Sequence, residues 1–260
     1  MQSTPTKLGK PKMKMPTSVI VKAGFLATVS IVLTRFLSLM LLLGGLPALR
    51  VGFGSVPIIM SGMMFGPVVG GITGVVADVV GYLINPMGGT FFPGFTLSAA
   101  LYGIIAGVLF KKMKIQNSKL NFNIINAFVM IAFGVGLYVL MLSTKVLTFE
   151  GGKPIFNDAD ALPLIVLMVL VTALFVTLPF AISYKFRNRE QKIHFDKIAF
   201  VVSLTYVINA LLLNTLWLSI LFDQGFVAFL PGRIIAAVVT IPLYTIILFT
   251  LGRFINLIEQ

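Results

Sequence analysis

The sequence predicts an all-α integral membrane protein, and three observations lead to this fold class. The chain has 260 residues, of which 58% are hydrophobic and only 11% are charged. Its mean hydropathy of +1.02 exceeds what a soluble domain of this length can bury in one core. Apolar runs close to the ~20 residues that a helix needs to cross a bilayer recur along the whole chain.

Eight spans are expected from the positions of these runs and of the glycines and prolines between them. They cover about residues 17–43, 51–65, 67–84, 95–110, 123–142, 162–183, 198–222 and 230–256. Basic residues gather in three clusters beside these runs, and the positive-inside rule assigns such clusters to the cytoplasm. We therefore expect cytoplasmic N- and C-termini, and one membrane domain, 1–260, whose surroundings are the lipid bilayer of a bacterial cell membrane.

The remaining composition excludes several classes of function. The net charge of +12 lies in clusters without interleaved aromatic residues, so nucleic acid is not an expected partner. Cysteine is absent and the single histidine, His194, lies in a basic loop, which argues against a metal site or a catalytic triad. The chain also lacks the GxxxxGK[ST] loop needed to hydrolyse ATP. We expect neither an enzyme nor a bound cofactor.

Only three charged side chains lie inside the long apolar runs: Arg35, Asp78 and Arg233. Each costs roughly 2.5 kcal/mol or more at the bilayer centre, so such residues usually serve a ligand or a partner charge. From the rise per residue, Arg35 is expected about 12 Å and Asp78 about 9 Å below the outer ends of their helices. With Arg50 in an outer loop, the surplus of positive charge predicts an outward pocket for an anion. The alternative is that Arg35 and Asp78 simply pair and hold two helices together.

Four further side chains qualify as ligand contacts, each with a structural alternative. Phe91 and Phe92 in an outer loop either cover a flat ring or form part of an aromatic belt at the membrane interface. Asn214 in the seventh span contacts either a polar ligand edge or a neighbouring helix, and Trp217 lies beside it. Glycines at every fourth position from 62 to 74 predict close packing of the second and third spans.

Two segments of the chain resemble a known family. They are ALRVGFGSVPIIMSGMMFGPVVGGITGVVADVVGYLINPMGGTFFPGFTLSA and NTLWLSILFDQGFVAFLPGRII, and they resemble the folate-type substrate-binding (S) component of energy-coupling factor (ECF) vitamin transporters. The resemblance implies a six-helix core with an outward vitamin pocket, which delivers folate through a transmembrane (T) component and two ATPase subunits. It also implies that Ala23 and Ala27, which match an Ala-x-x-x-Ala motif, help to form the docking face.

Folate offers chemistry that fits the candidate residues. Asp78 can accept two N–H donors from a pterin edge, and Phe91, Phe92 or Trp217 can stack on the ring. Arg35, Arg50 or Arg233 can pair with the two carboxylates of the glutamate tail, but the sequence does not assign them individually. The alternatives are an S component for riboflavin, thiamine or pantothenate, and a stand-alone secondary transporter of an organic anion.

The middle of the sequence differs from the pattern of this family. Residues from about 115 to 196 are expected to be an inserted transmembrane hairpin, which divides the core into 18–114 and 197–258. Because the insertion adds an even number of spans, the topology of the following helices is preserved.

Overall fold

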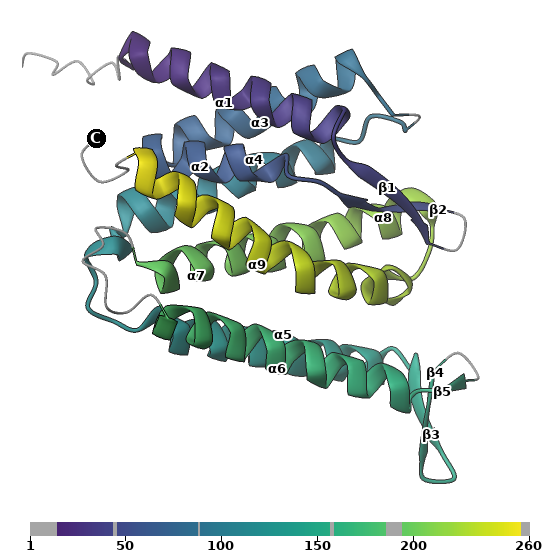
Figure 1. Cartoon of the computed structure of the whole chain (residues 1–260). Helices are drawn as coiled ribbons and strands as arrows, with labels where there is room; N and C mark the ends of the chain where they lie inside the picture. Colours follow the sequence, from purple (N-terminus) through teal and green to yellow (C-terminus); the bar gives the residue numbers. More distant parts are fainter. Residues whose placement is uncertain (1–14, 44–45, 88, 157–158, 186–193, 256–260) are drawn as a thin grey trace, which may run out of the picture.

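Helices packed side by side dominate the structure (Figure 1). The computed structural model describes residues 15–43, 46–87, 89–156, 159–185 and 194–255. The α-helices are α1 (Thr17–Arg35), α2 (Ser55–Phe65), α3 (Pro67–Ile84), α4 (Pro93–Gly107), α5 (Phe122–Ser143), α6 (Leu162–Lys185), α7 (Phe195–Tyr206), α8 (Asn214–Phe222) and α9 (Leu230–Ile255). A π-helical segment, Val207–Leu213, joins α7 to α8, so the two form one continuous helical stretch.

Seven helical stretches in the described part of the chain are long and apolar enough to cross a membrane. They are Thr17–Arg35, Pro67–Ile84, Pro93–Lys112, Phe122–Ser143, Leu162–Tyr184, Phe195–Phe222 and Phe226–Gly252. The remaining predicted span is α2, a helix of only 11 residues that is buried from Val56 to Met64. It packs against α1, α3, α4 and α9, as expected for a helix that is apolar on every side.

The predicted first helix is too long. Helix α1 ends at Arg35, and the apolar run beyond it forms strand β1 (Leu39–Leu43), which pairs antiparallel with β2 (Leu46–Val51). Hydrophobicity alone does not separate a short apolar strand from the end of a helix. Arg35 is therefore the last residue of its helix and not about 12 Å inside it.

Close packing of α2, α3 and α4 explains the glycine spacing. Gly70 on α3 lies so close that an added Cβ atom would come 2.5 Å from the Cα atom of Gly62 and 2.7 Å from the carbonyl oxygen of Gly103. Any larger residue would force the backbones apart, as in other small-residue helix contacts. The glycines thus pack a third helix, α4, in addition to the predicted pair.

Helices α5 and α6 form a hairpin on the side of the bundle opposite α1 (Figure 1). They pack against α7 and α9, and a small sheet of β3 (Leu147–Glu150), β4 (Lys153–Phe156) and β5 (Ala159–Asp160) lies between them in the chain. Two residues at the start of α7 hold the connector between α4 and α5 in place. Asp196 accepts from the N–H of Phe122 at 3.0 Å, and Lys197 donates to two carbonyl groups of the connector, those of Gln116 and Ser118.

Candidate functional site

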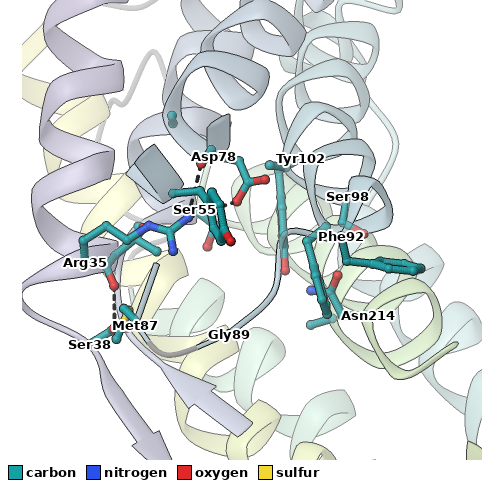
Figure 2. Close-up of a pocket in the computed structure, with 18 of the residues that line it drawn as sticks. Arg35, Ser38, Ser55, Asp78, Met87, Gly89, Phe92, Ser98, Tyr102 and Asn214 are labelled. Carbon is teal, nitrogen blue, oxygen red and sulfur yellow. Dashed lines mark hydrogen bonds and ion pairs between the residues drawn. The ribbon is translucent and has the colours of Figure 1, made fainter. Parts of the chain in front are cut away.

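A cavity of about 570 Å³ lies among α1, α2, α3, α4, α7, α8 and α9 (Figure 2). Its volume falls within the ~300–1,000 Å³ typical of small-molecule pockets. The connection between α3 and α4 also contributes to the lining, through residues 86, 87 and 89–92. The cavity therefore collects side chains from both the N-terminal and the C-terminal half of the sequence.

An ion pair occupies one end of the cavity. The Arg35 Nη2 atom lies 3.4 Å from Asp78 Oδ1, and the two side chains are 4% and 20% exposed. The other carboxylate oxygen, Oδ2, accepts from the hydroxyl of Thr96 at 2.7 Å. Arg35 also donates to the backbone carbonyls of Asp78 and Asn85. The pairing that the sequence left as an alternative is thus formed, and it lies in the cavity wall (Figure 2).

Arg233 and three tyrosines form a second polar group in the lining. Arg233 is buried and donates from Nη1 to the carbonyl of Ala210 at 2.6 Å. Tyr102 and Tyr206 lie close enough to interact with its charge, and Tyr206 makes an edge contact with Tyr244. These four side chains come from α4, α7 and α9. A guanidinium with two phenol groups nearby can bind a carboxylate through several donors.

An aromatic wall lies between α4 and α8. The Phe92 ring is 5.8 Å from that of Phe95 and 5.9 Å from that of Trp217, centroid to centroid, within the range of favourable ring contacts. Trp217 does not line the cavity. Its indole N–H donates to the hydroxyl of Ser98 at 3.0 Å, and both Ser98 and Phe92 do line it. Trp217 therefore supports the wall from behind.

Two oxygen atoms, one in the π-helical segment and one directly after it, belong to residues that line the cavity. The carbonyl of Ala210, inside the segment, accepts from Arg233 and at 3.4 Å from the hydroxyl of Thr215. Asn214 follows the segment and lines the cavity. Within the described part of the chain its Oδ1 atom is buried and has no hydrogen-bond partner, so it is an acceptor without a donor. Local π-helical turns of this kind often occur at functional sites.

Six of the eight predicted ligand residues meet in this cavity. They are Arg35, Asp78, Phe91, Phe92, Asn214 and Arg233. Trp217 lies behind the wall, and the side chain of Arg50, in β2, lies outside the described residues. Sequence reasoning missed the three tyrosines and Thr96. The only sequence signal for Thr96 was its place within PGFTLSA, beside the residues that carry the family resemblance.

The predicted docking residues do not share one exposed face. Ala27 is only 4% exposed and faces the helices that α1 packs against, whereas Ala23 is half-buried. The exposed face of α1 instead carries Gly24 and Thr28, with Phe25 at 67% exposure. The Ala27 side chain thus faces the bundle in this structure, and a docking role for Ala23 and Ala27 stays a prediction.

Comparison with known proteins identifies the family. The model of the family described as ECF-type riboflavin transporter, S component, matches residues 14–156, more than half of the chain. The chain belongs to this family. It is therefore an S component, a multi-pass protein of the bacterial cell membrane, in a family of transporter components and not of enzymes.

Two further similarities concern individual members. The folate transporter FolT of Clostridium novyi (strain NT) is 46% identical to the S component over 99 residues, which make up 38% of this chain and 54% of FolT. The chain thus matches about half the length of that curated relative. A crystal structure of FolT bound with folic acid has a TM-score of 0.53 at 22% identity, covering 92% of this chain and 94% of that one. This second similarity shows the shared fold.

Proposed function

We propose that this S component binds folate at the outer face of the membrane and delivers it through a T component and two ABC ATPase subunits. The observation that carries the proposal is the composition of the cavity. An acidic group, an aromatic wall and a buried arginine line one volume of about 570 Å³, and folate offers a donor edge, a flat ring and two carboxylates. The local identity to FolT over 99 residues supports the same ligand.

The proposal assigns a part of folate to each part of the cavity. Asp78 accepts the pterin N–H groups, since its Oδ1 atom is only weakly engaged by Arg35 at 3.4 Å. Phe91 and Phe92 stack on the pterin or the benzoyl ring. Arg233 and its tyrosines bind a carboxylate of the glutamate tail, while Asn214 Oδ1 accepts from a remaining N–H donor. Trp217 keeps Phe92 in place, and Arg50 remains a candidate for the second carboxylate.

A binding assay with the purified protein tests the proposal. Folic acid should bind in a 1:1 ratio, and Asp78→Asn should weaken it by about tenfold or more, because a hydrogen bond to a charged group contributes ~1.5–3 kcal/mol. Thr96→Val is the matched control, since it removes a bond to the same carboxylate but keeps the charge. Absence of folic acid binding by the unchanged protein contradicts the proposal.

Riboflavin is the second candidate ligand, because the matching family model is described by that vitamin. Its ring would stack on the same aromatic wall, but it has no carboxylate for Arg233. Competition between folic acid and riboflavin therefore separates the two candidates. Displacement of folic acid by equimolar riboflavin would favour the second one, whereas thiamine and pantothenate serve as controls for nonspecific displacement.

We also propose that the chain has no enzymatic activity or cofactor of its own and that docking uses the exposed face of α1. Gly24 has no atom within 4 Å of the position of an added Cβ, so a partner helix can approach there closely. The α5–α6 hairpin lies on the opposite side of the bundle (Figure 1), where it leaves that face open. This arrangement supports the division into a core, 18–114 and 197–258, and a hairpin, 115–196, inserted into one membrane domain.

A further inference from the structure

We propose that Asn85 is a positioning residue that couples the Arg35–Asp78 pair to the cavity-lining connection between α3 and α4. Asn85 does not itself line the cavity, and nothing in the sequence pattern singled it out. The inference rests on the proposed function, because it concerns the same cavity. It adds a residue whose effect on the ligand is indirect.

Asn85 holds Arg35 by two hydrogen bonds that run in opposite directions. Its side-chain Nδ2 atom donates to the backbone carbonyl of Arg35 at 3.3 Å, and its own carbonyl accepts from Arg35 Nη1 at 3.3 Å. Arg35 is the last residue of α1, so its carbonyl has no acceptor role inside the helix. Asn85 satisfies that carbonyl and fixes the guanidinium with one residue.

Asn85 also sets the direction in which the chain leaves α3. Its Oδ1 atom accepts from the N–H of Met87 at 3.0 Å, which is an Asx turn. Met87 has a φ of 55°, a left-handed conformation that non-glycine residues rarely adopt without support from their surroundings. Met87 lines the cavity, as does Arg35 (Figure 2). Further along the same connection, the ring of Phe91 lies 5.2 Å from that of Tyr82, centroid to centroid.

The two functions of the Asn85 side chain belong to different atoms. The Nδ2 atom donates to the backbone carbonyl of Arg35, whose guanidinium contacts Asp78. The Oδ1 atom accepts from the N–H of Met87, at the start of the cavity-lining residues that follow. Asn85 is therefore the shared support of the acidic end of the cavity and of the connection beside it. Loss of the amide should loosen both at once, whereas a carboxylate retains only the second function.

The chain offers a matched control and a clean reporter. Asn121 makes the same Asx turn, accepting from the N–H of Asn123 at 3.0 Å, but it lies at the start of α5 and not at the cavity. Since the chain has no cysteine, T90C introduces a single thiol into the cavity lining. Thiol labelling then reports on the connection without any ligand, and affinity is measured in the same variants without T90C.

We expect N85A to raise the labelling rate of the T90C thiol and the Kd for folic acid, each by about tenfold, since two hydrogen bonds are lost. N121A should change both by less than about twofold. N85D should keep the labelling rate of the unchanged protein but raise the Kd, because it retains the acceptor for Met87 and loses the donor to Arg35.

The outcomes separate this inference from the proposed function. Labelling of N85A at the rate of N121A would overturn the positioning role, whether or not folic acid binds. If the unchanged protein does not bind folic acid but N85A labels faster than N121A, the positioning role stands and the folate assignment fails. If N85A does not fold, N85D decides the matter, and an unchanged Kd in N85D would overturn the coupling to Arg35.

Discussion

Gly81→Ala provides a quantitative test of how Arg35 is held. Gly81 lies on α3 one turn before Asn85, and a Cβ atom added to it would come 2.9 Å from Arg35 Nε. Ordinary van der Waals contact begins at 3.4 Å, so the guanidinium would have to retreat. Its three hydrogen bonds, at 3.2, 3.3 and 3.4 Å, are already long for N–H···O bonds, and we expect such a retreat to break them.

The magnitude follows from two opposing effects. Three hydrogen bonds of ~0.6–1 kcal/mol each amount to roughly 2–3 kcal/mol. Replacement of glycine by alanine inside a helix stabilises the folded protein by about 1 kcal/mol. The net loss is therefore about 1–2 kcal/mol, which corresponds to a fall of several degrees in the midpoint of thermal unfolding. The affinity for folic acid should fall as well, because the displaced guanidinium disturbs Asp78.

Gly136→Ala is the matched control for this experiment. Gly136 lies within α5, and an added Cβ atom there has no atom within 4 Å. This variant should unfold at the same temperature as the unchanged protein or above it, with unchanged affinity. Differential scanning fluorimetry in detergent and a folic acid titration measure both quantities. If Gly81→Ala is as stable and binds as tightly as Gly136→Ala, Arg35 is not held as described.

Three other perturbations test separate parts of the molecule. Arg233→Gln should weaken the binding of folic acid by about tenfold or more but should weaken that of 6-methylpterin, which carries no carboxylate, much less. Equal losses of affinity for both ligands would contradict a carboxylate site at Arg233. Ser98→Ala should shift the fluorescence emission of Trp217, the only tryptophan, and lower the affinity for folic acid by less than about tenfold, since it removes one hydrogen bond behind the aromatic wall. An unchanged emission spectrum would count against that bond. Gly24→Leu on α1 should lower folate uptake in cells that express the complete transporter but leave binding to the purified protein unchanged. Gly136→Leu should change neither uptake nor binding. Normal uptake with Gly24→Leu would exclude docking at this face.

The sequence predicted the positions of the helices well because long apolar runs allow few other structures. It also placed Asp78 and Arg233 in one pocket, because the C-terminal part of α3 and the start of α9 were expected on the same side of the membrane, and both residues line the cavity. It failed at residues 36–43, where an apolar strand and an apolar helix have the same composition. The end of α1 therefore depended on pairing with β2, a contact that hydrophobicity does not encode.

The tyrosines of the cavity were not predictable in the same way. Tyr102, Tyr206 and Tyr244 lie on three helices, and a tyrosine in an apolar run is equally compatible with a lipid-facing position. Their convergence on one cavity, with Tyr102 and Tyr206 near Arg233, depends on the rotation of each helix about its axis. The same is true of Ala27, whose spacing from Ala23 was correct for a helix face but did not indicate which face is exposed.

The π-helical segment Val207–Leu213 fixes the phase between the two halves of a long helix. In an α-helix each residue advances by about 100°, so an extra residue accommodated in a wide turn rotates everything beyond it by that angle. Deletion of one residue from this segment would allow a regular helix but would turn Asn214 and Trp217 away from their present neighbours. A shift of one residue in the alignment of relatives at this point would therefore mark a change in the wall of the cavity, even where the flanking residues are the same.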